Sequence, residues 1–131
     1  ALPQAQRDIF SFCQNLPQDL LVRDKRCWAE DFREWLKSSD ERYPVPMADF
    51  HGAALNFSSS GATDSSRSRN YLWMNNGTVR AFFASFSVSV TRCLTGDGTA
   101  AYKRKWDDYL ALWNRDAHRN ARGAWHTSRL W

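Results

Sequence analysis

The chain of 131 residues contains no run of about 18 apolar residues, so it holds no segment that could cross a membrane as a helix. It begins without an initiator methionine, a basic leader region or an apolar leader core, and we therefore expect a mature or excised polypeptide. Its cysteines match neither a zinc finger nor the Cys-x-x-Cys redox spacing, so we expect no metal and no cofactor.

Aromatic residues, by contrast, are abundant. Seven tryptophans, eight phenylalanines and four tyrosines supply an aromatic core to a chain whose apolar fraction is 43%. This composition argues against intrinsic disorder. A chain of this length is typical of one domain and buries roughly two thirds of the surface of its unfolded form. We therefore expect a single domain over residues 1–131.

Positive charge is concentrated late in the sequence. Eighteen Lys and Arg residues stand against fourteen acidic residues, which gives a formal net charge of +4. The late basic residues are Lys103, Arg104, Lys105, Arg115, Arg119, Arg122 and Arg129. Such a cluster can contact nucleic-acid phosphates, and that binding would weaken steeply with salt. We favour the simpler interpretation of a solvated helix face and expect no nucleic-acid partner.

Three cysteines are an odd set, and we expect two of them to pair. Cys13 and Cys27 both lie beside helical patterns, and their spacing suits a disulfide between adjacent helices. Cys93 is left over, either free and buried or paired outside this chain. A disulfide favours an extracellular or luminal setting.

Two N-glycosylation sequons point to the same compartment. Asn56-Phe57-Ser58 lies at the edge of a serine-rich stretch, and Asn76-Gly77-Thr78 lies at a predicted turn. A glycan could be tolerated at either place. We therefore predict glycosylation of Asn56 and Asn76 in an extracellular or luminal protein.

The first half of the chain predicts helices. The pattern indicates a helix between Pro3 and Pro17, followed by a polar connection over Gln18–Arg26. A second helix is broken by two following prolines, and a shorter helix over about Met47–Phe57 leads into a flexible loop over residues 58–68. The second helix should bury Trp28, Phe32, Trp35 and Leu36. The third should bury Met47, Phe50, Ala54 and Phe57.

The apolar runs on either side of Asn76-Gly77 predict a β-hairpin with a type I′ turn. The facing pairs should be Asn75 with Thr78, Met74 with Val79, Leu72 with Ala81 and Tyr71 with Phe82. One face should carry Tyr71, Trp73, Phe82, Ala84, Phe86, Val88 and Val90. The other should carry Leu72, Met74, Val79, Ala81, Phe83, Ser85, Ser87 and Ser89. The far half of the long strand thus has one buried face and one small polar face.

A long helix and a final strand complete the pattern. After the break at Gly96-Asp97-Gly98, Thr99 can cap a helix from about Ala100 to His118. Its apolar stripe, expected in the core, is Tyr102, Trp106, Tyr109, Leu110 and Trp113. Ala124–Trp131 then reads as a strand parallel to the long one.

The order of hairpin, helix and strand is β-β-α-β. A ferredoxin-like β-α-β-β-α-β domain has one more strand, placed centrally between the third and the fourth. Because the early residues predict only helices, this strand should lie before Ala1 or come from elsewhere. We thus predict an α+β fold with a helical section over residues 1–57 and a partial ferredoxin-like unit over residues 69–131.

Several segments together resemble a known family. They are RCWAEDFREWL, the break YPVP with the helix after it, NGTVRAFFASFSVSV, KRKWDDYLALWN and GAWHTSRLW. In this order they resemble an extracellular porter subdomain of the eukaryotic resistance-nodulation-division transporters, in the Dispatched and Patched-like group. The resemblance covers most of Cys13–Trp131.

The resemblance implies a polytopic membrane protein that moves sterols or lipid-modified ligands. Ion coupling in that family belongs to membrane segments, which this chain does not contain. The section seen here would be a non-enzymatic wall of an external conduit, or a docking surface. Its partners would be the remainder of a longer membrane-embedded chain and a sterol or lipidated protein ligand.

A stand-alone secreted module that binds a polysaccharide or a protein is the alternative. Trp125 and Trp131, alternating with Arg129, could stack on a sugar or fill a pocket of a partner, although both also suit a core. An enzyme is disfavoured, because no spacing brings a nucleophile, a base and an orienting acid together. The residues considered for catalysis are His51, His118, His126, Asp64, Asp97 and Asp116.

Overall fold

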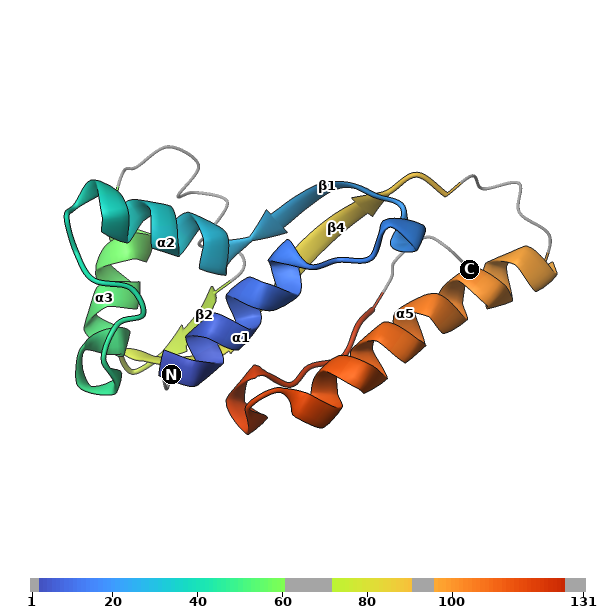
Figure 1. The fold of residues 1–131 in the computed structure, drawn as a ribbon. Coiled ribbons are helices and arrows are strands. Elements are labelled where there is room, and N and C mark those ends of the chain that lie inside the picture. The colour runs from blue at the N-terminus through green and yellow to red at the C-terminus, as the bar shows by residue number, and fades with distance from the viewer. Residues whose placement is uncertain (1–2, 61–71, 91–95, 127–131) are drawn as a thin grey trace.

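The chain forms a mixed α+β fold, and the computed structural model describes residues 3–60, 72–90 and 96–126 (Figure 1). The α-helices of this described part are α1 (Pro3–Gln14), α2 (Trp28–Ser38), α3 (Met47–Ser59) and α5 (Gly96–Asp116). Short 3-10 helices are η1 (Gln18–Leu20) and η3 (Arg119–Ala121). The strands are β1 (Val22–Cys27), β2 (Leu72–Asn75), β3 (Thr78–Phe82) and β4 (Ala84–Val88). The α+β class predicted from the sequence is confirmed.

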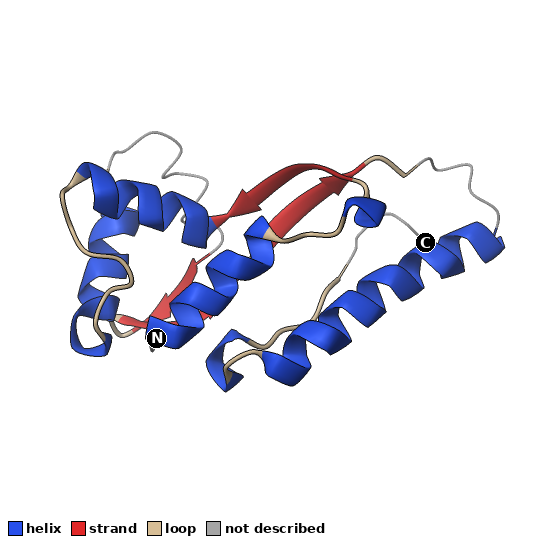
Figure 2. Cartoon of the chain, in the orientation of Figure 1, coloured by secondary structure: helices blue, strands red, loops and turns tan. Residues whose placement is uncertain are grey.

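The strands form two antiparallel pairs that share one long stretch of chain. β2 pairs with β3, and β1 pairs with β4, while Phe83 alone separates β3 from β4. Figure 2 shows these strands in red, with the helices in blue around them. The long strand therefore contacts β2 along its first half and β1 along its second half.

The pairing of β1 corrects two predictions. The sequence predicts a polar connection over Gln18–Arg26, but this segment holds η1 and most of β1. Lys25 lies opposite Phe86, so the second half of the long strand finds a partner within the chain. The prediction that this partner lies before Ala1 is therefore wrong.

β1 escapes sequence-based prediction because its side chains do not show the pattern of a strand. Four of its six residues are charged, and their burial does not alternate as in a half-buried strand. Charged side chains are common on edge strands, where they discourage pairing with other chains. The backbone N–H of Ser89 also donates to the carbonyl of Leu21 at 2.9 Å, which extends the pairing beyond the strand.

The Asn-Gly turn adopts the conformation that the sequence predicts. Asn76 has a φ of 51° and Gly77 a φ of 72°, as the two central residues of a type I′ turn require. Two predicted pairs beside the turn are confirmed: Asn75 with Thr78 and Met74 with Val79.

A β-bulge then changes the register of the hairpin. Arg80 is an extra residue, so Trp73 faces Ala81 and Leu72 faces Phe82. The bulge places Phe82 on the same side as Leu72, where both pack against the core, and it leaves Trp73 57% exposed. Leu72, Met74 and Val79 share a side as predicted, but Phe82 lies on that side too, so the predicted combination of faces is wrong. Two predicted pairs are also wrong: Leu72 with Ala81 and Tyr71 with Phe82.

The second half of the long strand alternates as predicted. Its side chains turned toward the helices are Ala84, Phe86, Val88 and Val90. Its exposed side chains are Ser85, Ser87 and Ser89. Figure 1 shows α1 and α5 on the same side of the β1–β4 pair. The serine side is thus the one that these two helices leave uncovered.

Three hydrophobic clusters hold the elements together. The first joins α2, α3 and β2 through Trp28, Phe32, Leu36, Val45, Phe50, Ala54, Phe57 and Leu72. The second joins α1, the β1–α2 junction and η3 through Ala5, Ile9, Cys13, Cys27, Ala29, Ala117 and Ala121. The third joins η1 to α5 through Leu20, Tyr102 and Trp106. Met47, which the sequence places in the core, is 60% exposed as the first residue of α3.

α5 begins at Gly96 rather than at the predicted Ala100, and its apolar stripe lies against the core as predicted. The stripe also carries a chain of hydrogen bonds. The Tyr102 hydroxyl donates to the carbonyl of Leu20 at 2.7 Å, and the Trp106 indole donates to that hydroxyl at 2.9 Å. These bonds satisfy the polar atoms that the aromatic stripe brings into the interior.

Two predicted segments fall largely outside the described residues. Of the strand expected over Ala124–Trp131, residues 124–126 are described and form no strand. Of the flexible loop expected over residues 58–68, Ser58 and Ser59 belong to α3, and residues 61–68 lie outside the described part.

A buried glutamine joins α1 to the break between α2 and α3. The Gln6 amide donates to the carbonyl of Val45 at 2.7 Å, and the Val45 N–H donates to the Gln6 side-chain oxygen at 3.0 Å. The Tyr43 hydroxyl donates to the Gln6 carbonyl at 2.9 Å, and burial raises the pKa of Tyr43 to about 12. The proline-containing break is thus fixed to α1 by three hydrogen bonds.

Of two buried tryptophans, only one has a hydrogen-bond partner for its indole N–H. This difference predicts that their substitution lowers the free energy of unfolding by different amounts. The Trp28 N–H has no hydrogen-bond partner among the described residues, whereas that of Trp106 donates to Tyr102. We expect Trp28→Phe to destabilise the fold less than Trp106→Phe, by about 1–2 kcal/mol, because only the second change removes a buried hydrogen bond. Urea unfolding of both variants measures the difference, and equal losses would contradict it.

Candidate functional site

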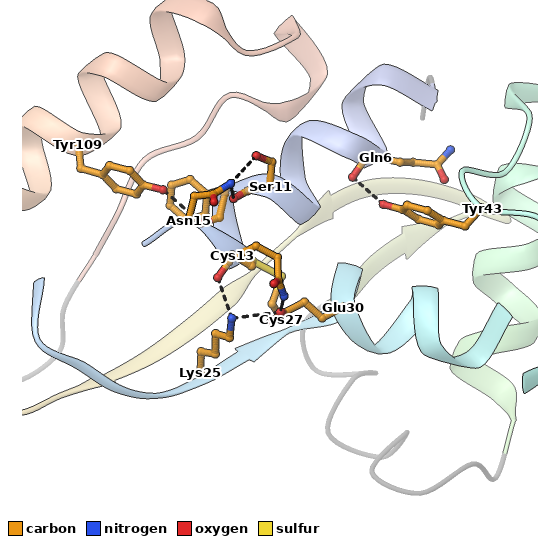
Figure 3. Close-up of a disulfide and its surroundings, with 11 residues drawn as sticks. Gln6, Ser11, Cys13, Asn15, Lys25, Cys27, Glu30, Tyr43 and Tyr109 are labelled. Atoms are coloured by element: carbon orange, nitrogen blue, oxygen red, sulfur yellow. Dashed lines mark hydrogen bonds and ion pairs between the residues drawn. A yellow bond between two sulfur atoms is a disulfide. The ribbon is translucent and has the colours of Figure 1, made fainter. Parts of the chain in front are cut away.

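The disulfide between Cys13 and Cys27 is formed, as the sequence predicts (Figure 3). Its setting differs from the prediction of two adjacent helices. Cys13 lies in the last turn of α1, and Cys27 ends β1 immediately before α2, with the two Cα atoms 6.4 Å apart. Both residues are buried in the second hydrophobic cluster. The bond therefore ties α1 to the point where strand becomes helix.

Charged and polar groups surround the disulfide. The Lys25 ammonium donates to the carbonyl of Cys13 at 2.8 Å and lies 3.0 Å from a carboxylate oxygen of Glu30. The Gln14 amide donates to the same carboxylate. The two sulfur atoms and a Glu30 oxygen lie within 4.8 Å of one another. Sulfur atoms bonded to each other are not thiolates, so this group cannot hold a metal ion in the oxidised protein.

A shallow groove of about 350 Å³ lies beside the disulfide. Leu16, Pro17 and Val22 supply its apolar part, and Arg23 and Lys25 supply positive charge. Lys25 is already engaged by Glu30. Asp24 also lines the groove, whereas none of the described histidines does.

His51 lies on α3, whereas His118 and His126 lie in the segment after α5, on either side of η3. His51 on α3 accepts a hydrogen bond from the backbone N–H of Val79 at 3.1 Å. His118 accepts one from the N–H of Asn120, and its own backbone N–H donates to Asp8 at 2.8 Å. His126 is exposed after η3. Each of the two bonded imidazoles thus supports a local piece of structure.

Of the acids considered with the histidines, Asp97 and Asp116 are described. Asp116 forms an ion pair with its neighbour Arg115 at 3.1 Å, and that pairing lowers the pKa of Asp116. Asp97 lies in the first turn of α5. Asp64 lies outside the described residues. Of the residues considered for catalysis, those described are not gathered into one site.

Both sequon asparagines are exposed. Asn56 lies in the last turn of α3, where the Ser58 hydroxyl donates to the carbonyl of Leu55 at 3.0 Å. Asn76 lies at the tip of the hairpin turn. Glycosylation of Asn56 and Asn76 stays a prediction, and the exposure of both side chains is compatible with it.

Trp125 packs on α5. Its indole N–H donates to Asp107 at 2.8 Å, its ring lies 6.5 Å from that of Trp106, and the Lys103 ammonium lies 5.6 Å from its ring centre. Hydrogen bonds from Lys103 and Trp125 lower the pKa of Asp107. The Trp125 ring thus packs against one side of α5. The binding role of Trp125 stays a prediction, and Arg129 and Trp131 lie outside the described residues.

Several of the late basic residues have local partners. Lys103 pairs with Asp107 one turn further along α5 at 2.7 Å, and Arg122 donates to the carbonyl of Ala117. Exposed pairs of this kind are usual on a solvated helix. This geometry is consistent with the solvated helix face that the sequence predicts.

Sequence reasoning misses the large aromatic side chains that are most exposed. Trp73 and Phe83 are 57% and 56% exposed, and neither was expected to mark a surface. The signal that could reveal them is the spacing of Val79 and Phe82, because two inward residues three positions apart require a bulge between them. The extra residue, Arg80, is charged, as suits an exposed position.

Loss of the disulfide should destabilise the fold strongly. The bond closes a loop with a sequence separation of 14, for which chain-entropy reasoning gives about 3 kcal/mol. We expect Cys13→Ser combined with Cys27→Ser to lower the free energy of unfolding by at least that amount, and reduction of the unmodified protein to have a similar effect. Guanidinium unfolding with and without a thiol reductant measures both, and an unchanged midpoint would contradict the prediction.

The His51–Val79 bond should make stability depend on pH. Burial is the largest cause that lowers the pKa of His51 from its ordinary value, and positive charges, among them that of Arg80, lower it further. A protonated imidazole cannot accept the Val79 N–H, so this stability is present above about pH 6.5 and is lost as the pH falls through the lowered pKa. We expect a loss of about 1 kcal/mol.

The matched control is His51→Asn, which keeps an acceptor and removes the titration. Urea unfolding between about pH 7 and pH 4 should show a steeper fall for the unmodified protein than for this variant. Parallel curves would show that His51 does not couple α3 to β3 in this way.

None of the helices in the part of the chain that the structure describes has the length and apolar character needed to span a bilayer. Comparisons with protein-family models, curated proteins and solved structures find no match to this chain. A function must therefore be inferred from the disulfide, the exposed sequons and the sheet.

Proposed function

We propose that this chain is a non-enzymatic extracellular or luminal domain of a membrane transporter or receptor of the Dispatched and Patched-like type. Its role is to line a conduit or docking surface for a lipid or a lipid-modified ligand. The remainder of a longer membrane-embedded chain is its principal partner in this proposal. The observation that carries it is the pairing of β1 with β4.

This pairing supports a ferredoxin-like arrangement. β1 is followed by helices, then by β2, by the long strand of β3 and β4, and by α5. The long strand pairs antiparallel with β1 and with β2. Five elements of a β-α-β-β-α-β unit thus occur in the required order, with α3 as an additional helix. The resemblance to porter subdomains implies the same unit with helical insertions.

The disulfide supports the proposed compartment. Cys13 and Cys27 are fully buried and pair in a domain whose two sequon asparagines are exposed. Disulfides of this kind persist in oxidising compartments and are rare in the cytosol. The placement of His51 on α3 and of His118 and His126 after α5 fits a role in binding or in structure rather than in catalysis.

A stand-alone binding module remains the second candidate, and the exposed pair Trp73 and Phe83 favours it. Large aromatic side chains on a surface are informative when they occur together, because they mark contact sites more often than single apolar residues do. The full-length gene separates the two candidates. Apolar spans of about 20 residues on both sides of this chain would support the transporter, and their absence would favour the module.

The compartment can be tested by glycosylation. We expect the chain, secreted from cultured eukaryotic cells behind a cleavable leader, to lose mass on treatment with an N-glycosidase. Ser58→Ala should remove the modification of Asn56, and Thr78→Val that of Asn76, while both leave the asparagines in place. Intact mass measurement counts the glycans.

The matched control is Asn75→Gln, which changes an exposed asparagine outside both sequons. Its mass shift should equal that of the unmodified chain. A secreted chain that carries no glycan and has freely alkylated Cys13 and Cys27 would contradict the proposed compartment.

A further inference from the structure

One side of the long strand and its partners carries two kinds of exposed side chain, aromatic rings and serine hydroxyls. Trp73 and Ala81 lie opposite each other in the hairpin, and Phe83 follows Ala81 on the same side of the long strand. The alternation continues through Ser85, Ser87 and Ser89, all exposed. Aromatic rings thus occupy one end of this surface and hydroxyl groups the other. We call this surface the open face.

β1 adds charge to the serine end of the open face. Arg26 lies opposite Ser85, and Asp24 lies opposite Ser87, so these residues share the side of the serines. The Asp24 carboxylate accepts a hydrogen bond from the backbone N–H of Lys25 at 2.9 Å, which partly occupies it.

A further arginine lies at the edge of the open face. Arg80 is exposed at the bulge opposite Trp73. Two arginines, Arg26 and Arg80, therefore stand against one aspartate around the face, in a chain with a net charge of +4. This charge excess complements an anionic ligand.

We propose that the open face binds an acidic polysaccharide, one that carries carboxylate or sulfate groups on its sugar rings. Trp73 and Phe83 present flat apolar surfaces on which the C–H faces of sugar rings can pack. The serine hydroxyls can donate to and accept from sugar hydroxyls. Guanidinium groups bind carboxylates and sulfates through paired hydrogen bonds.

The mixture of groups favours this ligand over a lipid bilayer. Three serine hydroxyls lie on the open face, and their burial in hydrocarbon would cost free energy without compensating hydrogen bonds. A hydrated anionic polymer satisfies both the hydroxyls and the arginines. The inference rests on the extracellular placement proposed above, where such polymers are encountered.

The test is fluorescence anisotropy of the secreted full chain with labelled, size-fractionated heparin as the acidic probe and dextran of similar length as the neutral one. We expect heparin to bind, dextran not to bind, and the affinity to fall as salt rises from about 50 to about 200 mM. Trp73→Ser combined with Phe83→Ser should weaken heparin binding about tenfold or more. Arg80→Gln should weaken it less and reduce its salt dependence.

Matched controls change the same kinds of residue elsewhere. Leu112→Ser removes an exposed apolar side chain from α5, where Leu112 is 54% exposed, and Lys105→Gln removes one exposed positive charge. Both should retain the affinity of the unmodified chain. Circular dichroism and thermal unfolding confirm that each variant is folded.

Three results would overturn the proposal: no heparin binding at low salt, equal losses in the control and open-face variants, or equal binding of dextran. Tighter face-dependent binding to a single-stranded oligonucleotide or to anionic vesicles would also overturn it, in favour of those ligands. The glycosylation result is independent of all these outcomes. Failure of the open face as a sugar site therefore leaves the proposed compartment standing.

Discussion

The pairing of β1 with β4 is the constraint on which the rest of the structure depends. Backbone pairing with β4 and the disulfide at Cys27 set the position of β1. The same disulfide holds the end of α1, and α2 begins at the next residue, Trp28. A displacement of β1 would therefore displace both α1 and α2.

The continuity of β3 and β4 extends this constraint to the hairpin. Because only Phe83 separates them, the position of β1 also orients β2 and the cluster that β2 forms with α2 and α3. Gln6 adds a further link, because its side chain joins α1 to the backbone of Val45 in the break before α3. Strand pairing, one disulfide and one buried amide thus connect all three hydrophobic clusters.

Elements with their own side-chain signal could be predicted from the sequence. The Asn76-Gly77 turn and the aromatic stripe of α5 are confirmed, because turn chemistry and helical periodicity are local properties. β1 could not be predicted, because its pairing depends on β4, far along the chain, and its charged sequence carries no strand pattern. The disulfide could be predicted as a pair, but its setting at a strand end depended on finding β1.

The open face shows how one extra residue determines which side chains a sheet exposes. Side chains alternate along a strand, so an extra residue transfers everything beyond it to the other face. Without the bulge at Arg80, Phe82 would share a side with Trp73, and the aromatic residues of the hairpin would divide differently between core and solvent. The Asn76-Gly77 turn alone could not reveal the bulged register, because it determines only the pairs next to the turn. Burial of Leu72 and Phe82 in one cluster selects the bulged register, and the exposure of Trp73 and Phe83 follows from that selection. The open face is therefore a consequence of how the core is packed, and any substitution that removes the bulge must alter both.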